Sequence, residues 1–380
     1  MKYYIYSILA IFCLALTSCK SDEDETSSQT TDLDDDNTTE KINDSYVYQL
    51  PVIFHVLYSD KNDDTQYISA TQIQKIMANV NEIYKGNVYG ESENINLKFI
   101  LATNDENGNK LSTPGVEYVK WDGEYPIDVS KFMSDNTGTN VKYIWDPNEY
   151  INVMMYNFKT SSDAQSTVLG VSHMPYTVKG DSALAGLDTV TVSTIRKSQL
   201  KFAYCSSINS LYANKESSRY YASDKGKSGY TYDSRDINVT VAHELGHYLG
   251  LHHLFTENVN NPGEYADTCM DTDYCKDTPS YNRVEYEDYL TYYMKTHTDT
   301  STISINDLLK RTNCDGDSFL SANIMDYMIS LGYKISANQK RRIRHVLYNS
   351  PLIPGPKVTS TSSRATGSEG KLDLPIRYVK

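Results

Sequence analysis

The sequence predicts an α+β fold. Two observations lead to this class: apolar, β-rich runs are spread over the first half of the chain, and three separate segments read as helices, two of them with capping boxes. A hydrophobic fraction of 39% in 380 residues is enough for a sizeable core. One large domain with insertions fits this length as well as two average domains do.

The strand-like runs begin at residues 50–58, an apolar run that suits a strand buried on both faces. We expect further strands, each bounded by loops rich in Asn, Asp, Gly and Ser, at residues 97–102, 150–158, 168–173 and 189–192. Residues 206–236 are polar and rich in Ser and Tyr, so we expect them to form a connection.

Three helices are expected. A serine and a glutamine form a capping box at residues 69–72, and one apolar stripe follows until Gly86 ends the helix. A second helix begins near Ile237. The third is capped in the same way and runs over residues 336–348.

The N-terminus has the marks of a secretory signal: a lysine, a mostly apolar run over residues 3–16, and small residues before Cys19. The apolar run is too short to span a bilayer as a permanent helix. Leu16-Thr17-Ser18-Cys19 resembles a bacterial lipobox, in which the cysteine becomes the lipidated first residue. An ordinary signal peptide that contains a cysteine is the alternative.

The residues after Cys19 are polar and acidic as far as about Asn43, and we expect a disordered tether that anchors the domain to the membrane. Lys20 followed by acids resembles the surface-export signal of Bacteroidota lipoproteins, which implies an outer-membrane, surface-exposed lipoprotein. Residues 1–41 carry −6 of the formal net charge of −13. This balance argues against nucleic acid as a partner, since phosphate binding needs a basic surface.

Four cysteines remain beyond the signal and Cys19, namely Cys205, Cys269, Cys275 and Cys314. An even number in an exported domain predicts two disulfides, with three possible pairings. Zinc ligation is the alternative, but Cys269 and Cys275 are too far apart for the usual knuckle spacing.

A metal site is indicated on the second helix. His243 and His247 are four residues apart, so their imidazoles share one helix face, and Glu244 lies beside them. Gly250 permits the turn that brings a third ligand, His253, to the same point. Three protein ligands leave one position open for water, which is typical of catalytic zinc.

The specificity of this pattern comes from its length. His-Glu-x-x-His alone recurs by chance, but with Gly250 and His253 the pattern fixes five positions, which a random sequence matches in roughly one window per few million. A surface helix with scattered histidines is the alternative. His252 is the adjacent candidate ligand, but it falls one residue short in the spacing.

The motif from His243 to His253 resembles the metzincin clan of zinc endopeptidases, and Asn323-Ile324-Met325-Asp326-Tyr327 resembles the clan's methionine turn. Within the clan the sequence is similar to the pappalysin family. This likeness covers about residues 50–347, and it includes residues 51–58, 145–153, 251–255, 277–279 and 335–344. Signal, tether and domain together also resemble the zinc-dependent metalloproteinase lipoproteins of Bacteroidota.

The resemblance implies a metzincin-like fold: a twisted mixed sheet with a backing helix, an active-site helix above the cleft, and an irregular lower subdomain with the methionine turn and the last helix. The implied organisation is a lipoprotein signal peptide (1–18), a disordered acidic tether (19–45), a catalytic domain (46–350) and a loosely attached C-terminal tail (351–380).

The resemblance also implies hydrolysis of peptide bonds by zinc-activated water, with Glu244 as general base. Tyr327 is expected to stabilise the oxyanion, with simple packing as the alternative, and Met325 to form a hydrophobic floor. The strand at residues 169–175 resembles the cleft rim, to which an extended peptide would add as an antiparallel strand. His173 on this rim is expected to be a surface histidine and not a ligand.

Two features depart from the family. The 72 residues from His253 to Met325 are more than expected, so cleavage preference does not carry over. No cysteine follows Met325, so the family's disulfide pattern does not transfer, and Cys205 is the alternative partner.

Two further alternatives stay open. Loops of related enzymes hold calcium, but the acids of the long segment lack EF-hand order, so we favour a solvated loop over a calcium site at Asp267, Asp271, Asp273 and Asp277. A catalytically weak surface binding protein or adhesin on the same scaffold is the alternative function, against which the intact Glu244 argues. A zinc hydrolase with a non-protein substrate is less favoured.

Overall fold

The computed structural model describes residues 45–86, 88, 90–160, 167–180, 182–217, 232–259, 263–299, 302–355 and 370–380. The predicted signal peptide, the predicted lipidation site Cys19 and nearly all of the predicted acidic tether lie outside the described residues.

The strands are β1 (Tyr48–Tyr58), β2 (Leu97–Leu101), β3 (Val116–Lys120), β4 (Ile151–Tyr156), β5 (Gly170–His173), β6 (Thr177–Val178), β7 (Thr189–Val190), β8 (Ser206–Asn209), β9 (Lys310–Thr312), β10 (Ser318–Leu320) and β11 (Tyr378–Val379). The α-helices are α1 (Ala70–Tyr84), α2 (Val129–Ser134), α3 (Ile237–Tyr248), α4 (Arg283–Thr296), α5 (Ile305–Leu309) and α6 (Ala337–Asn349). Short 3₁₀ helices lie at Thr139–Tyr143, Lys197–Gln199 and Ser210–Tyr212.

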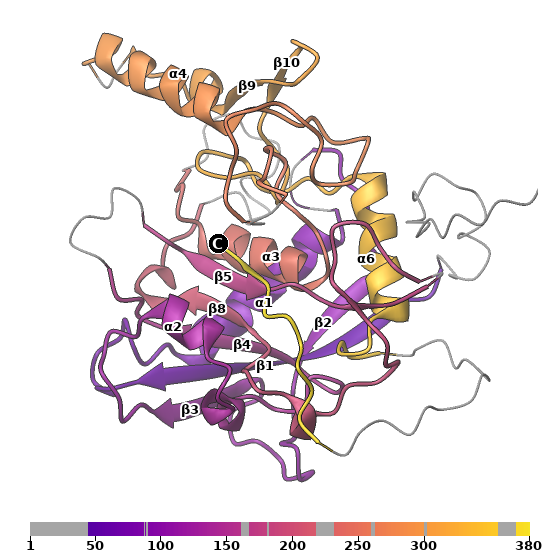
Figure 1. The fold of residues 1–380 in the computed structure, drawn as a ribbon. Helices are drawn as coiled ribbons and strands as arrows, with labels where there is room; N and C mark the ends of the chain where they lie inside the picture. The colour runs from indigo at the N-terminus through magenta and orange to yellow at the C-terminus, as the bar shows by residue number, and fades with distance from the viewer. Residues whose placement is uncertain are drawn as a thin grey trace, which may run out of the picture.

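Within the described residues, seven strands form one mixed sheet in the order β11-β5-β8-β4-β1-β2, and β3 also pairs with β1 (Figure 1). The strands β2, β3 and β4 are all parallel to β1, and β8 is parallel to β4. At the other end, β5 is antiparallel to β8, and β11 is antiparallel to β5. The central strands β1 and β4 are almost wholly buried, as expected for parallel strands that are covered on both faces.

Two helices connect this sheet to the histidine motif. The Ser69 side chain caps α1, and one apolar stripe of α1 is buried as predicted. The Tyr84 hydroxyl of α1 donates to the Ala242 carbonyl of α3 at 2.9 Å, and α3 also lies against β5 and β8. The predicted mixed sheet, backing helix and histidine-bearing helix are therefore confirmed.

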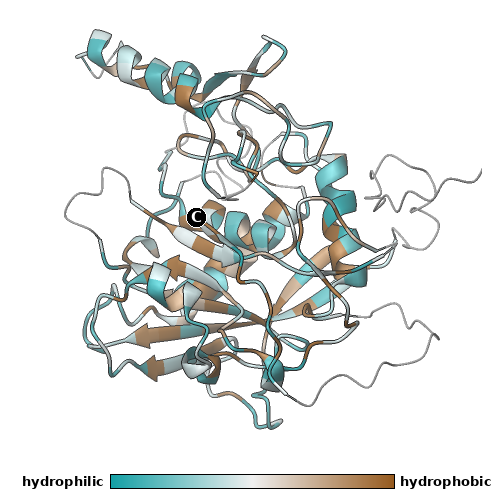
Figure 2. Cartoon of the chain, viewed as in Figure 1, coloured by the Kyte–Doolittle hydropathy of each residue, from teal (hydrophilic) through white to brown (hydrophobic). Residues whose placement is uncertain are grey.

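The long segment between His253 and Met325, called the insertion below, forms a substructure of its own. It contains α4, α5 and the β9–β10 hairpin, and α4 with the hairpin projects away from the sheet (Figure 1). Most of α4 is hydrophilic (Figure 2). The buried Arg311 anchors its base, since the guanidinium lies 3.2 Å from the centroid of the Tyr286 ring and donates to the Ile329 carbonyl.

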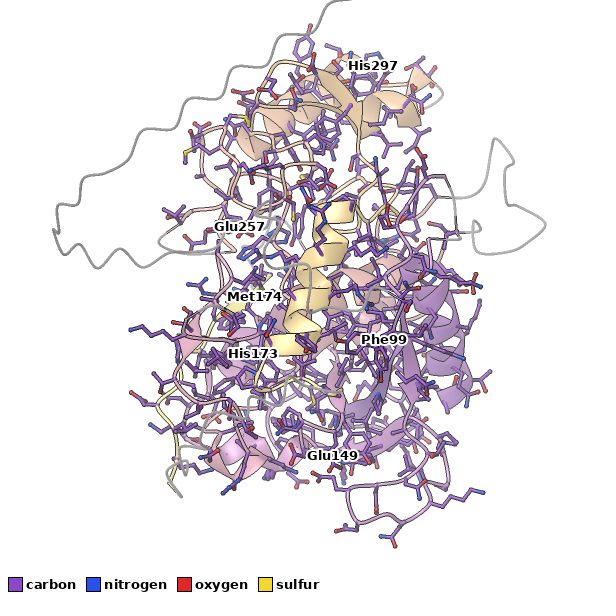
Figure 3. All side chains as sticks on the ribbon, turned by 90° about the vertical axis from the view of Figure 1, so that its right-hand side faces the viewer. Phe99, Glu149, His173, Met174, Glu257 and His297 are labelled. Carbon is purple, nitrogen blue, oxygen red and sulfur yellow. A yellow bond between two sulfur atoms is a disulfide. The ribbon has the colours of Figure 1, made fainter. Side chains whose placement is uncertain are left out.

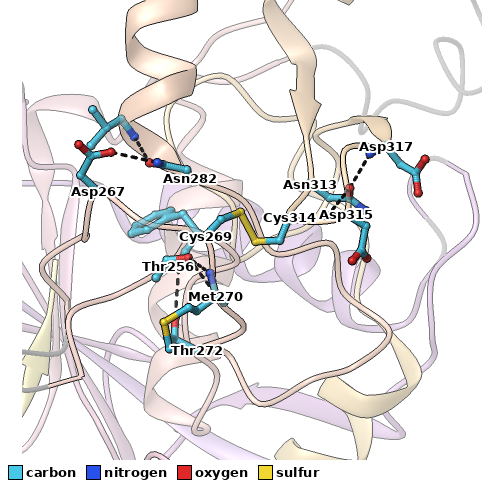
Figure 4. The surroundings of a disulfide bond; sticks show 12 residues. Thr256, Asp267, Cys269, Met270, Thr272, Asn282, Asn313, Cys314, Asp315 and Asp317 are labelled. Carbon is cyan, nitrogen blue, oxygen red and sulfur yellow. Dashed lines mark hydrogen bonds between the residues drawn. A yellow bond between two sulfur atoms is a disulfide. The ribbon is translucent and has the colours of Figure 1, made fainter.

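One disulfide, Cys269–Cys314, ties two distant parts of this segment together (Figure 4). The prediction of two disulfides is wrong, because Cys205 and Cys275 are buried free thiols. Cys205 lies in the core just before β8, where its sulfur contacts the Met133 sulfur, so it does not substitute for the family's missing cysteine. Burial raises the pKa of the Cys205 thiol to about 12.

The expectation of a loosely attached tail needs correction for residues 351–355 and 370–380. Leu352 and Val379 are fully buried. Before Val379, alternate apolar side chains pack on the core, namely Leu372, Leu374, Ile376 and Tyr378. This period of two is that of a strand, and it explains why the segment joins the sheet as β11. Among the described residues, no helix has the length and apolarity to cross a bilayer.

Candidate active site

The helix α3 is buried along almost its whole length, because it lies between the sheet and the long segment that follows it. It begins at Ile237, with the Asp236 side chain accepting a hydrogen bond from the Asn238 backbone N–H. Its last two turns carry His243 and His247, and both side chains are buried. The predicted spacing therefore brings both imidazoles to one internal face.

The Nε2 atoms of three histidines converge on one point. The distances are 3.0 Å from His247 to His243, 3.1 Å from His247 to His253 and 3.2 Å from His243 to His253. Tetrahedral zinc with Zn–N bonds of about 2.05 Å holds its nitrogens roughly 3.3 Å apart. Within the described residues these three side chains form the one cluster of metal-ligating groups, and its dimensions fit zinc.

The opposite ring nitrogens support the same conclusion. Nδ1 of His243 lies 2.7 Å from the Ile324 carbonyl, and Nδ1 of His247 lies 2.8 Å from the Leu251 carbonyl. A carbonyl only accepts, so the proton is on Nδ1 and the Nε2 lone pair faces the centre. Burial lowers the pKa of His243 to about 3 and that of His247 well below its usual range, which keeps both rings neutral.

The turn after α3 depends on Gly250, whose φ is +92°. A Cβ there would lie 2.7 Å from Val346 of α6, so both the backbone angle and the close packing favour glycine. The buried Arg342 of α6 donates from Nε to the Gly250 carbonyl at 2.5 Å. This turn brings His253 back beneath α3, as the spacing predicted.

Met325 is fully buried beneath α3, where the methionine turn was expected. A Cβ added to Gly246 would lie 2.5 Å from the Met325 sulfur, so the glycine permits this close packing. The Met325 carbonyl accepts from the Leu254 N–H, and the Asn323 side chain accepts from the Met325 N–H. Met325 thus packs on the histidine helix while its backbone is fixed from both sides.

Glu244 is a buried carboxylate at the mouth of the histidine cluster. Its side chain is almost fully buried, Oε2 has no hydrogen-bond partner among the described residues, and burial raises its pKa well above the usual value. Gly170 of β5 lies directly against it, since a Cβ there would be 2.4 Å from Glu244 Oε1. An unpartnered buried carboxylate is costly, which marks Glu244 as a functional candidate.

Tyr327 is half-buried beside the cluster, and its ring centroid lies 5.5 Å from that of His253 and 6.2 Å from that of His243. The guanidinium of Arg283, at the start of α4, lies 4.5 Å from the centroid of the Tyr327 ring. The long insertion therefore contacts the tyrosine that the methionine-turn pattern singled out.

The sequence reading missed Glu257. Its carboxylate accepts from His253 Nδ1 at 2.5 Å and from His252 Nδ1 at 3.2 Å. Burial alone would raise its pKa, but the bonds from His252 and His253 hold the pKa of Glu257 well below its usual range. In Figure 3, Glu257 lies between His297 of the same long segment and the residues His173 and Met174 at the end of β5. A carboxylate four residues after a candidate ligand was the available signal.

A cleft of about 810 Å³ opens in front of the cluster. Its lining includes Leu169 and Gly170 at the start of β5, and His243 and Glu244 of α3. The insertion supplies a further part of the lining, namely Tyr265, Arg283, Glu287, Leu290 and Thr291. The insertion thus borders the cleft.

Two other sets of expected residues lie elsewhere. His173 is buried, with its ring nitrogens near the Cys205 and Met133 carbonyls, so the expectation of a surface histidine is wrong. The acids Asp267, Asp273 and Asp277 accept hydrogen bonds from Asn282, Thr278 and Ser336, respectively. Asp271 accepts from the backbone of Asp273 and Tyr274. Calcium binding by these acids stays a prediction from the sequence.

Comparisons with known proteins find a family model that matches the segment carrying the site. Residues 221–348 match the Peptidase_M43 family, described as pregnancy-associated plasma protein-A. A search of curated proteins finds no match. Among solved structures, mature mirolysin of Tannerella forsythia in complex with a cleaved peptide is 20% identical, with a TM-score of 0.46, and the match covers 79% of this chain and 91% of that one. A promirolysin mutant of the same organism is 19% identical, with a TM-score of 0.45, and the match covers 79% of this chain and 80% of that one.

The matched residues 221–348 contain all three clustered histidines, Glu244 and the methionine turn. The segment that carries the site therefore matches the pappalysin (Peptidase_M43) family model, and this match supports a metalloendopeptidase.

Proposed function

We propose that this chain is a zinc-dependent endopeptidase in which His243, His247 and His253 hold the metal and Glu244 is the general base. The observation that carries the proposal is the convergence of three Nε2 atoms within 3.0–3.2 Å of one another beside a buried carboxylate with an unpartnered oxygen. A bound metal would account for the converging nitrogens, and a role in proton transfer would account for the unpartnered carboxylate oxygen.

Zinc, when bound, lowers the pKa of a water molecule and polarises the scissile carbonyl. The protein must then transfer a proton from this water to the leaving group. Glu244 faces the cleft and neighbours a ligand, so its free oxygen is placed to take the proton of the attacking water and pass it to the leaving amine. Gly170 leaves room for this carboxylate and fixes the distance between the rim and the base.

Two residues of the methionine turn complete the site. Tyr327 lines the cleft within ring-contact distance of two ligands, and its hydroxyl is a suitable donor to the oxygen that becomes negative. Met325 packs against α3 at Gly246 and supports the helix there. We assign Tyr327 to oxyanion stabilisation and Met325 to support.

The substrate is proposed to be an extended peptide. The β5 strand borders the cleft and lies at the edge of the main sheet apart from the short β11. A peptide added to this edge would be held by backbone hydrogen bonds, with its scissile bond near Glu244.

The test uses protein that begins at residue 46. Bound zinc is quantified, and a peptide library is digested in parallel with Glu244→Ala. Zinc near one equivalent, with cleavage that Glu244→Ala abolishes, supports the proposal. Zinc binding without any cleavage that depends on Glu244 would refute it and favour a surface binding protein or adhesin.

We also propose that the chain is an outer-membrane lipoprotein, anchored through Cys19 and exposed on the cell surface. The lipobox-like Leu16–Cys19 and the following acids support this proposal. Metabolic labelling with a radioactive fatty acid should mark the wild-type chain and not Cys19→Ser. Added protease should digest the domain on intact cells, and full protection would contradict surface exposure.

A further inference from the structure

The second edge of the rim strand β5 is covered by the chain's own C-terminal segment. In β11, Tyr378 pairs with His173 and Val379 pairs with Ser172 in antiparallel register. The pairing continues beyond the strand, since the Met174 N–H donates to the Arg377 carbonyl at 3.0 Å. The other edge of β5 is bonded to β8, so β11 occupies the edge that a peptide would use.

This covered edge leads directly to the candidate active site. The strand β5 begins at Gly170, which lies against Glu244, and runs away from it towards His173. Because β11 is antiparallel, it runs towards Glu244. One more step of its register brings Lys380 opposite Val171, the neighbour of Gly170. The end of the chain in Figure 1 lies beside β5 accordingly.

A substrate whose scissile bond lies at Glu244 would run the same way. Its residues before the scissile bond would add antiparallel to β5 and reach the base from the His173 end. The segment 375–379 therefore has the position and direction of the N-terminal half of a bound peptide.

The segment lies in a groove with both walls defined. Val379 is fully buried, and a Cβ on Gly263 of the insertion would lie 3.3 Å from its Cα. The Tyr176 hydroxyl donates to the Pro375 carbonyl at 2.5 Å. The rim strand thus lies on one side and the insertion on the other.

The groove has a specific place for a basic side chain. Arg377 Nε lies 3.2 Å from Asp188 Oδ2, and Arg377 Nη1 donates to the Gly186 carbonyl at 2.8 Å. The same guanidinium lines a pocket of about 230 Å³ with His252 and Glu257, the residue that supports the ligand His253. A carboxylate and a carbonyl that both face the groove are suited to an arginine or lysine.

We propose that this groove is the subsite for substrate residues that precede the scissile bond, and that residues 375–379 occupy it as an internal substrate mimic. The groove takes an extended peptide with a basic residue at the position of Arg377 and an aliphatic residue, two positions later, at that of Val379. This inference rests on the proposed peptidase function. A substrate must displace the segment, so the segment competes with substrate.

The test compares two variants of the chain from residue 46 to its last residue. Arg377→Glu with Val379→Asp releases the segment, because the first change opposes Asp188 and the second places a charge in the groove. Asp373→Ala is the control, since its side chain is 96% exposed and pairs with Lys201 outside the groove. Both are made with Glu244→Ala, so that nothing is cleaved.

The probe is a fluorescein-labelled peptide with the sequence of residues 371–380, and binding is read by anisotropy. We expect the released variant to bind it about tenfold more tightly than the control, whose own segment competes at a high effective concentration. Replacing the arginine of the probe by alanine should weaken binding. Equal, absent or arginine-independent binding to the two variants would overturn the proposal.

An activity measurement separates this inference from the proposed function. With Glu244 intact, release should lower KM for a cleaved peptide about tenfold at unchanged kcat, because the segment acts as a competitor. If the released variant binds the probe but cleaves no peptide, the proposed groove is supported and the proposed peptidase function is refuted. If peptide is cleaved but KM does not change on release, the proposal that residues 375–379 occupy a substrate subsite is refuted. If the double variant unfolds on heating well before the control, Arg377→Glu alone serves, because this side chain is 26% exposed.

Discussion

The Glu257 carboxylate accepts a hydrogen bond from His253 Nδ1 at 2.5 Å, so the ring proton is on Nδ1 and Nε2 of this third candidate ligand faces the histidine cluster unprotonated. His243 and His247 use backbone carbonyls for the same purpose. His253 therefore differs from the other two, because its orientation depends on a side chain that mutation can remove.

Glu257→Gln should weaken zinc binding by about 10–100-fold, since supporting partners of metal-ligating histidines typically contribute that much. Competition with a chromophoric chelator measures the change. Glu264→Gln is the matched control, because Glu264 is exposed in the same loop. Unchanged zinc affinity in Glu257→Gln would show that the turn alone orients His253.

Gly170→Ala should reduce kcat/KM by about 100-fold, because a displacement near 1 Å of a catalytic group has an effect of that size. The added Cβ would lie 2.4 Å from Glu244 Oε1, so the carboxylate must move. Zinc content should stay at the wild-type level, since the ligands are not touched.

Gly108→Ala is the control for this change. Its φ is +81° and no atom lies within 4 Å of the added Cβ, so the substitution should lower stability by about 1 kcal/mol without affecting activity. Wild-type peptide cleavage by Gly170→Ala would contradict the assignment of Glu244 as base.

The candidate ligands and the proposed base were predictable because they depend on local geometry. The four-residue spacing of His243 and His247 puts both on one face of a helix, and the αL turn at Gly250 limits where His253 can lie. Glu257 was missed because it follows an irregular turn, where no periodicity shows which way a side chain points.

Three strands of the main sheet were missed, namely β3, β8 and β11, and the last two were missed for different reasons. The strand β8 is short and polar, and it is buried because its hydroxyls find partners: Ser206 bonds to Ser172, and Ser207 accepts from Tyr156. Tertiary contacts override its weak strand propensity. The strand β11 follows a Ser- and Thr-rich stretch, so composition concealed its alternating apolar residues.

The single disulfide predicts how many thiols react before and after reduction. Protein from residue 46 on should show two reactive thiols after denaturation without reductant and four after reduction, because Cys205 and Cys275 are free. Thiol titration with a chromogenic disulfide reagent measures both numbers. No free thiol before reduction would indicate two disulfides and contradict the structure.

Removing this disulfide should also destabilise the protein. The Cys269–Cys314 bond closes a loop with a sequence separation of 45. In the chain-entropy model its loss costs about 4 kcal/mol, so Cys269→Ser with Cys314→Ser should lower the free energy of unfolding by that order. Chemical denaturation checks the value. A change below about 1 kcal/mol would show that the insertion is held by its other contacts, such as Arg311 on Tyr286.

Tyr327→Phe separates oxyanion stabilisation from packing. The ring stays in contact with His253 and under the Arg283 guanidinium, so stability and zinc content should hardly change. Loss of the hydroxyl should lower kcat by about 100-fold at similar KM, because a donor to the developing charge acts only in the transition state. Tyr292→Phe is the control, since Tyr292 is 69% exposed on α4. A kcat within about twofold of wild type would assign Tyr327 to packing alone, because each 1.4 kcal/mol of lost transition-state stabilisation is a factor of about ten in rate.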